Sequence, residues 1–250
     1  MSKSREKFFS LVLLLAIFFK ALIANDELNL ILDGIFQKQE KMNREISDVT
    51  FDVYYTYLET KDNNKIEKSI KAWRRVFMQE FENQQHKFLA MIENNRRLNP
   101  AEMEKNIREW RKYEKMIKNT KLPFNPKFSA YYNYYLSDSI NYDTGKVWKI
   151  GFKPKRQKAG LVQGFAYILK QDTNVIQLNF VPVKLPAILR NFKIQIDYSK
   201  QNSFWLPNKF SLEMEIVVKI IATLYKRNIY IQEEYYNYQF NQGIDVFELK

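Results

Sequence analysis

The sequence predicts an α+β protein, mainly β, in which a long curled antiparallel sheet forms an unclosed half-barrel. From residue 122 onward, apolar residues recur at every second position in successive segments that are separated by turns, with no helical pattern between them. The composition agrees, since 16 Tyr and 19 Phe favour pleated, half-buried surfaces. Only two segments have helical periodicity, so these two helices are expected to cover the concave face of the sheet.

Residues 1–24 are predicted to be a signal peptide. Lys3, Arg5 and Lys7 precede an apolar run over residues 8–19, and Ala21 and Ala24 are small residues suited to cleavage. The run is shorter than the roughly 20 residues that a membrane-spanning helix needs. The alternative is an uncleaved anchor helix. Either way the chain is expected to be exported to the periplasm or cell envelope, where a protein without Cys has neither disulfides nor an acylated cysteine.

An amphipathic helix is predicted over residues 26–46, followed by a strand. The apolar positions of the helix recur at near-helical spacing, and Asp26 suits its positive N-terminal end. The pattern changes to period two over residues 50–60, and the Asp-Asn-Asn run at residues 62–64 indicates a hairpin turn.

Residues 65–92 fit two structures. Apolar residues at near-helical spacing favour a helix over residues 65–82. Two polar clusters, at residues 83–85 and 93–95, would instead act as turns and divide the stretch into two strands. Periodicity alone slightly favours the helix.

The second helix is predicted over residues 99–119. Asn99 can cap its start, Pro100 suits the first helical position, and Glu102 completes a capping box. Its polar face is rich in basic side chains that are candidates for contact with a partner. These are Arg108, Arg111, Lys112 and Lys115.

The strands after residue 122 complete a single domain over residues 25–241, with a C-terminal tail at 242–250. We expect them at residues 130–136, 148–152, 161–169, 175–183, 192–198, 210–218 and 229–238. Between the last two lies an apolar segment at a predicted hairpin tip, a second candidate for membrane or partner contact. Its apolar residues are Ile220, Ile221, Leu224 and Tyr225.

This order of elements resembles the family of outer-membrane lipoprotein carriers and receptors (LolA and LolB). A closer resemblance, over residues 50–241, is to uncharacterised exported proteins described as lipoprotein-sorting-like. It is carried by RRVFMQEFENQQHKFLAMIENNRRLNPAE, YYNYYLSDSI, KVWKIGFKPKR, GFAYILKQDTNVIQLNFVPVK, FWLPNKFSLEME and EEYYNYQF. The resemblance implies strands rather than a helix over residues 65–82, and a cavity that binds acyl chains.

The residue types exclude most catalytic chemistry. With no Cys and with His86 as the one histidine, most metal and nucleophile chemistry is removed, so we expect no enzyme activity, no metal and no cofactor. The net charge of +12 would suit nucleic acid, but an exported protein rarely meets it. Anionic lipid or an envelope surface is the expected partner. The sequence does not predict an oligomeric state.

The leading hypothesis is therefore a protein that binds a lipid acyl chain, or another apolar ligand, inside the half-barrel. The candidate cavity residues are Phe165, Tyr167, Phe192, Ile194, Ile196, Phe210, Leu212 and Met214. The alternative is a non-catalytic adaptor with a filled core, docking on an envelope protein through its basic helix.

Overall fold

A single curved antiparallel sheet of eleven strands dominates the structure. The computed structural model describes residues 26–61, 65–81, 83–142, 145–220 and 223–244. The strand order is β4-β3-β2-β1-β11-β10-β9-β8-β7-β6-β5, and the edges β4 and β5 do not pair over the described residues. The strands are β1 Asp48–Lys61, β2 Ile66–Gln79, β3 Asn83–Glu93, β4 Arg96–Arg97, β5 Tyr132–Tyr142, β6 Gly145–Pro154, β7 Val162–Leu169, β8 Val175–Pro182, β9 Leu189–Gln201, β10 Phe204–Ile220 and β11 Thr223–Phe240. The predicted fold class is confirmed.

The first and last strands pair near the middle of the sheet. β1 lies against β11 from Val49 opposite Phe240 to Lys61 opposite Arg227. The remaining strands follow chain order outward on both sides, as hairpins joined by short turns do. This arrangement ties the two halves of the chain into one sheet with one concave face.

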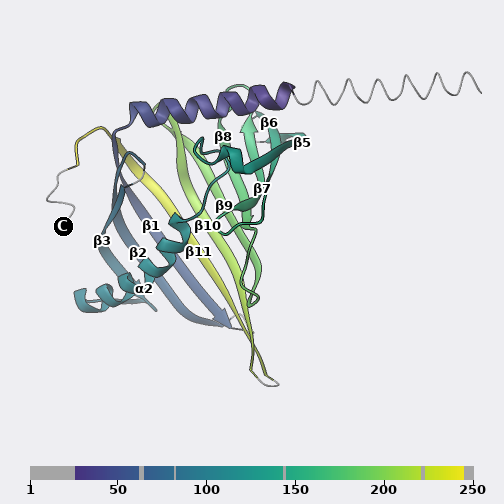
Figure 1. Ribbon diagram of the computed structural model, residues 1–250. Helices are drawn as coiled ribbons and strands as arrows, with labels where there is room; N and C mark the ends of the chain where they lie inside the picture. The colour runs from purple at the N-terminus through teal and green to yellow at the C-terminus, as the bar shows by residue number, and fades with distance from the viewer. Residues whose placement is uncertain (1–25, 62–64, 82, 143–144, 221–222, 245–250) are drawn as a thin grey trace, which may run out of the picture.

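Two helices pack on that face. The N-terminal helix, described over residues 26–45, runs across one end of the sheet, and α2 (Pro100–Lys118) packs against the β1–β3 side (Figure 1). A short 3-10 helix, η1 (Ser129–Tyr131), precedes β5. The capping box of α2 is confirmed, because the Asn99 backbone N–H donates to Glu102 Oε2 at 3.0 Å and the Glu102 N–H donates to Asn99 Oδ1 at 3.0 Å.

The prediction of a helix over residues 65–82, which periodicity favoured, is wrong. The strands implied by the family resemblance are confirmed there. β2 and β3 form a hairpin in which Gln79 lies opposite Asn83. The turn therefore begins at Glu80 and Phe81, both with positive φ, rather than at residues 83–85. The sequence pattern did not indicate this turn, because neither Glu80 nor Phe81 is a residue type that usually forms turns.

Two interior clusters extend under the N-terminal helix. Leu28, Ile31, Leu32 and Ile35 join a large cluster with β6–β10, whereas Met42 and Ile46 join a smaller one with β1 and β2. A third cluster lies under α2, where Met103, Ile107 and Trp110 pack against Tyr55, Ile70, Ala72 and Met91.

Candidate functional site

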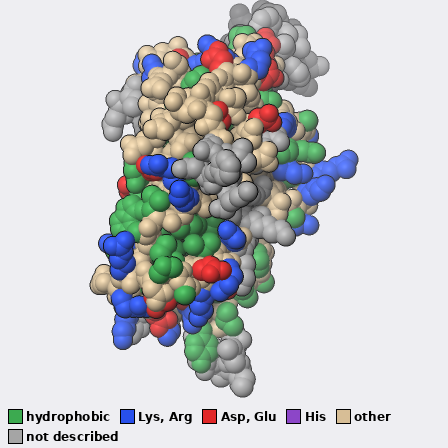
Figure 2. All heavy atoms as spheres, turned by 90° about the vertical axis from the view of Figure 1, so that its left-hand side faces the viewer, with side chains coloured by type: hydrophobic (Ala, Val, Ile, Leu, Met, Phe, Trp, Pro, Cys, Tyr) green, Lys and Arg blue, Asp and Glu red, His purple; other side chains and the backbone are tan. Residues whose placement is uncertain are grey.

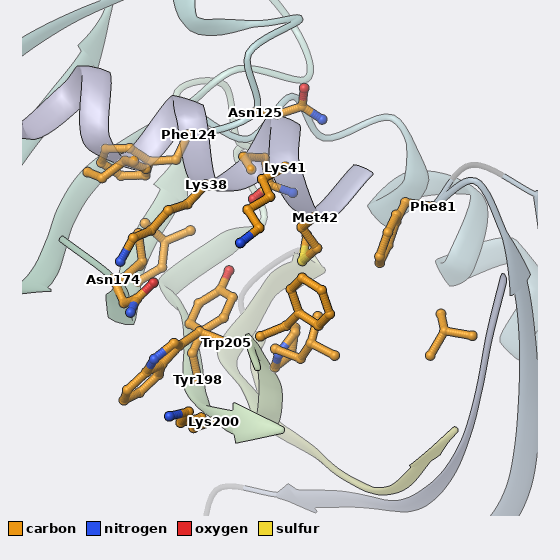
Figure 3. Close-up of a pocket in the computed structure, with 18 of the residues that line it drawn as sticks. Lys38, Lys41, Met42, Phe81, Phe124, Asn125, Asn174, Tyr198, Lys200 and Trp205 are labelled. Atoms are coloured by element: carbon orange, nitrogen blue, oxygen red, sulfur yellow. The ribbon is translucent and has the colours of Figure 1, made fainter. Parts of the chain in front are cut away.

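A cavity of about 670 Å³ lies between the N-terminal helix and the sheet. Figure 3 shows the side chains that surround it. Its apolar wall is built from Ile35, Met42, Val49, Phe51, Met78, Phe81, Leu122, Phe124, Val175, Leu178, Tyr198, Phe204, Trp205, Leu206, Pro207, Tyr235 and Tyr238. Its polar groups are Lys38, Gln39, Lys41, Gln84, Asn125, Asp172, Thr173, Asn174, Lys200 and Ser203. The cavity is therefore an apolar chamber with polar groups supplied by a few segments.

The helix forms one wall because its apolar stripe is interrupted for one turn. The apolar stripe runs as far as Ile35 and resumes at Met42. The turn of helix between them presents Lys38 and Gln39 instead. All four of these residues line the cavity. The break separates the two interior clusters and leaves the space between them unfilled.

A bulge in β11 forms the opposite wall. Thr50 pairs with Gln239 and Asp52 with Tyr236, so Phe51 alone faces two residues, Asn237 and Tyr238. Asn237 has a φ of 58°. The bulge brings Tyr235 and Tyr238 to the same face, where their rings lie 5.9 and 5.0 Å from Phe51.

The turn between β7 and β8 closes the end of the cavity under the helix. A Cβ on Gly34 would lie 2.8 Å from Thr173 Oγ1, so glycine permits the helix to approach this turn. Thr173 has a φ of 52°, uncommon for a β-branched residue, and its N–H bonds to the Leu169 carbonyl at 2.9 Å. The Lys38 ammonium donates to the Asp172 carbonyl.

The three tyrosines of the cavity remain protonated at neutral pH. Burial raises the pKa of Tyr198 and Tyr238, and burial followed by the Glu233 charge raises the pKa of Tyr235 well above its usual value. The Tyr235 hydroxyl donates to Glu233 Oε2 at 2.7 Å and the Tyr238 hydroxyl to the Pro207 carbonyl at 2.6 Å. These groups can orient a ligand through hydrogen bonds without carrying charge.

Beside the cavity, under α2, the interior holds a buried charge. Arg74 is 3% exposed and donates to Glu233 Oε1 at 2.8 Å. Its guanidinium lies 4.7 Å from the ring centre of Trp110, close enough for a cation–π contact. The Arg74 Nε and Nη1 atoms have no hydrogen-bond partner among the described residues. Aromatic rings and one carboxylate thus fill this part of the concave face.

None of the eight residues suggested as cavity lining is among those that surround this cavity. Phe192, Ile194, Phe210, Leu212 and Met214 are buried in the large cluster, and Ile196 packs against it. Phe165 and Tyr167 alternate with core residues Ala166 and Ile168, so they lie on the opposite face. There the Lys149 ammonium is 4.4 Å from the Phe165 ring centre. The structure therefore moves the candidate site from the middle of β9 and β10 to their end near the helix.

The suggested contact residues are placed only in part. Arg108 and Arg111 are exposed on α2, while the side chains of Lys112 and Lys115 lie outside the described part. Tyr225 is 51% exposed near the end of the long β10–β11 hairpin; Ile221 and the side chains of Ile220 and Leu224 are likewise not described. On the side of the molecule that carries β3 and α2, hydrophobic side chains gather with Lys and Arg around them (Figure 2).

The residues missed by sequence reasoning come mostly from turns, strand ends and the helix break. The available signals were Lys38 and Gln39 within an apolar stripe, and Asn237 within an aromatic strand. Lys38 and Gln39 interrupt the helical period, and Asn237 interrupts the strand alternation. Each of these two interruptions marks a wall of the cavity.

A family model for a family of unknown function, DUF5686, matches residues 31–238. The chain belongs to this family. No curated protein matches this chain. The family description gives no activity.

Several solved structures are similar to this chain at low sequence identity. A DUF1329 family protein from Desulfovibrio piger has 9% identity and a TM-score of 0.41, covering 88% of this chain and 99% of its own. A putative outer membrane lipoprotein-sorting protein domain from Vibrio parahaemolyticus has 8% identity and a TM-score of 0.43, with 88% and 95% covered. A LolA superfamily protein from Nitrosomonas europaea has 8% identity and a TM-score of 0.38, with 87% and 96% covered. We base function on the cavity rather than on these similarities.

The part of the chain that the structure describes contains no group of three or more His, Cys, Asp or Glu side chains that could hold a metal ion. Neither of the helices described is both long and apolar enough to cross a membrane.

Proposed function

We propose that this protein binds the acyl chain of a lipid or lipoprotein in the cavity beneath its N-terminal helix. The supporting observation is the size and lining of that cavity: about 670 Å³, with seventeen apolar or aromatic side chains around it. Small-molecule sites usually measure about 300–1,000 Å³. Because protein interiors are otherwise close-packed, a space of this size between two packed clusters indicates room for a ligand.

The proposed role is carriage or storage rather than catalysis. Burial raises the pKa of Tyr198 and Tyr238 further above neutrality, and the Asp172 carboxylate accepts hydrogen bonds from the backbone N–H of Asn174 at 3.2 Å and from its side-chain amide at 2.7 Å, so these groups are poorly suited to acid–base catalysis at neutral pH. The apolar wall suits retention of an acyl chain. The predicted signal peptide, which lies outside the described residues, would place this activity in the periplasm or cell envelope.

A tryptophan that fills the cavity tests the proposal. Val175 lines the cavity on β8, and Val181, on the same strand, does not. We expect Val175→Trp to weaken binding of a fluorescent fatty acid at least tenfold, whereas Val181→Trp binds as wild type does. Both variants should retain a cooperative unfolding transition, since added bulk costs about 1–3 kcal/mol.

Native mass spectrometry of protein purified from cell envelopes provides the second measurement. Lipid should accompany the wild type and the Val181→Trp variant, and should be depleted from Val175→Trp. The proposal would be overturned if the wild type carried no co-purified lipid and also failed to take up the fatty acid.

The adaptor alternative has separate support in the filled cluster under α2. There Trp110 packs at 5.3 Å on Phe88, and Arg108 and Arg111 face solvent. It predicts that reversing these two charges to Glu abolishes capture of an envelope partner and leaves fatty-acid uptake unchanged. Unchanged partner capture would count against this second role.

A further inference from the structure

We infer that the ligand is an anionic amphiphile, whose carboxylate or phosphate head is held by Lys38, Lys41 and Lys200 at the polar side of the cavity. This inference rests on the proposed function, because it assigns a head group to the chain that the cavity would hold. It concerns the charge of the ligand, which an apolar wall alone does not select.

The three lysines converge from two elements that are far apart in sequence. Lys38 and Lys41 lie one turn apart on the N-terminal helix, and Lys200 lies near the end of β9. All three line the cavity. In Figure 3, Lys38 and Lys41 descend from the helix into the cavity with Tyr198 beneath them, and Lys200 lies beyond Tyr198.

The acidic groups nearby offset these charges only in part. Asp172 is the one acidic residue in the lining, and its carboxylate is engaged by Asn174. Lys38 contacts the carbonyl of Asp172, not its carboxylate. Lys41 approaches Glu45 at 3.7 Å, but these side chains are 64% and 49% exposed, a geometry that contributes little energy. An anionic head would supply the missing counter-charge.

An apolar wall lines the same cavity as these lysines. Phe51, Phe204 and Leu206 belong to the interior cluster beneath the helix, or pack against it, and each lines the cavity. Tyr238 stacks at 5.0 Å on Phe51. A chain lying on this wall would remain within the same cavity as the lysines, so the lining offers both an apolar surface for the chain and cationic groups for the head of an amphiphile.

The Lys38 side chain is exposed overall, but its partial desolvation at the cavity still affects its charge. Desolvation lowers the pKa of its ammonium, and the Asp172 charge partly opposes this. A bound anion would favour the charged form of Lys38. Binding of an anionic ligand is therefore expected to be accompanied by proton uptake at pH values around the lowered Lys38 pKa, and to weaken as the pH rises above it.

The experiment compares ligands that differ only in their head group. Wild-type protein is titrated with a fluorescent fatty acid, its methyl ester, and a monoalkyl phosphate carrying the same chain and fluorophore. The carboxylate and the phosphate should each bind at least tenfold more tightly than the ester at low salt. Raising the ionic strength should reduce this preference, since screening weakens exposed charges.

The variant Lys38→Gln/Lys41→Gln/Lys200→Gln should bind all three ligands with nearly the affinity of the ester. A matched control, Lys155→Gln/Lys158→Gln/Lys193→Gln, removes three exposed lysines that do not line the cavity and lowers the net charge equally. It should keep the preference. Circular dichroism and unfolding of both variants would verify the fold.

The outcomes separate the two proposals. Equal binding of acid and ester by the wild type, or loss of preference in the control as well, would overturn the anionic head group and leave acyl-chain binding intact. Binding of none of the three ligands would overturn the proposed function. Preference for only one of the two anions would identify which head group the lysines select.

Discussion

The two helices cover the same face of one sheet, yet one closes over a cavity and the other over a filled interior. Under α2, the side chains of Trp110, Phe88 and Arg74 meet, with ring-to-ring and cation-to-ring distances of 5.3 and 4.7 Å. Under the N-terminal helix, Lys38 and Gln39 replace the apolar side chains that would fill the equivalent gap. The difference shows that a few residues on the covering helix decide whether a curved sheet encloses space.

The largest expected effect concerns the filled side. Arg74→Ala leaves Glu233, whose side chain is 13% exposed, without its cationic partner, and should lower the free energy of unfolding by about 3–5 kcal/mol. Arg108→Ala is the control, because Arg108 and Glu104 form an ion pair on α2 in which the side chains are 63% and 70% exposed. It should cost about 1 kcal/mol or less.

Denaturant unfolding measures both variants, and Arg74→Met/Glu233→Leu should recover much of the loss by removing both charges. Equal losses for Arg74→Ala and Arg108→Ala would show that burial of the Arg74–Glu233 pair is unimportant. If the filled side and the cavity are independent, the free energy of fatty-acid binding by the folded Arg74→Ala variant should change less than its free energy of unfolding.

An intermediate effect is expected at the bulge that shapes the cavity wall. Asn237→Val places a β-branched residue at a φ of 58° and removes the hydrogen bond to Asp52 Oδ2 at 3.1 Å. Together these should cost about 2–3 kcal/mol. Asn237→Gly keeps the backbone conformation and should cost about 1 kcal/mol, largely from the lost bond.

Unfolding and fatty-acid titration together test this prediction. If the bulge positions Tyr235 and Tyr238, the valine variant should also lose affinity, and the glycine variant should retain it. Equal affinity in both variants would mean that the cavity wall tolerates a shift of these rings.

The smallest expected effect lies at the helix break. Because burial lowers the Lys38 pKa, the protonated side chain carries a penalty in the folded state at neutral pH. Lys38→Met should therefore raise the free energy of unfolding by a few tenths of a kcal/mol, since solvent screens a partly exposed charge. The gain should shrink as the pH rises from the lowered Lys38 pKa to the ordinary lysine value of 10.5, because the penalty disappears once the lysine is neutral in both states.

Lys41→Met serves as the comparison, since that side chain is 64% exposed and should give no similar gain. A pH-independent difference between wild type and Lys38→Met would contradict the assignment to protonation. Lower affinity for the anionic probe, together with higher stability, would show that Lys38 is retained for binding at the expense of stability.

Elements with strong local signals were predictable. Asn99 and Glu102 fixed the start of α2 through mutual hydrogen bonds, and alternation along β9 and β10 identified their buried faces. Residues 66–79 were not predictable from periodicity, because Trp73 and Arg74 both have their partners on neighbouring elements. The family resemblance, rather than the pattern, led to the correct strands there.

The sequence by itself determined the mainly β fold, the two covering helices and the cap of α2, because these depend on periods and hydrogen bonds within a few residues. Only the tertiary structure decided where the cavity lies. Its walls come from the break at Lys38, the bulge at Asn237 and the turn at Thr173, segments up to 199 residues apart. Long-range pairing brings these local irregularities together, and no local pattern records which of them will meet.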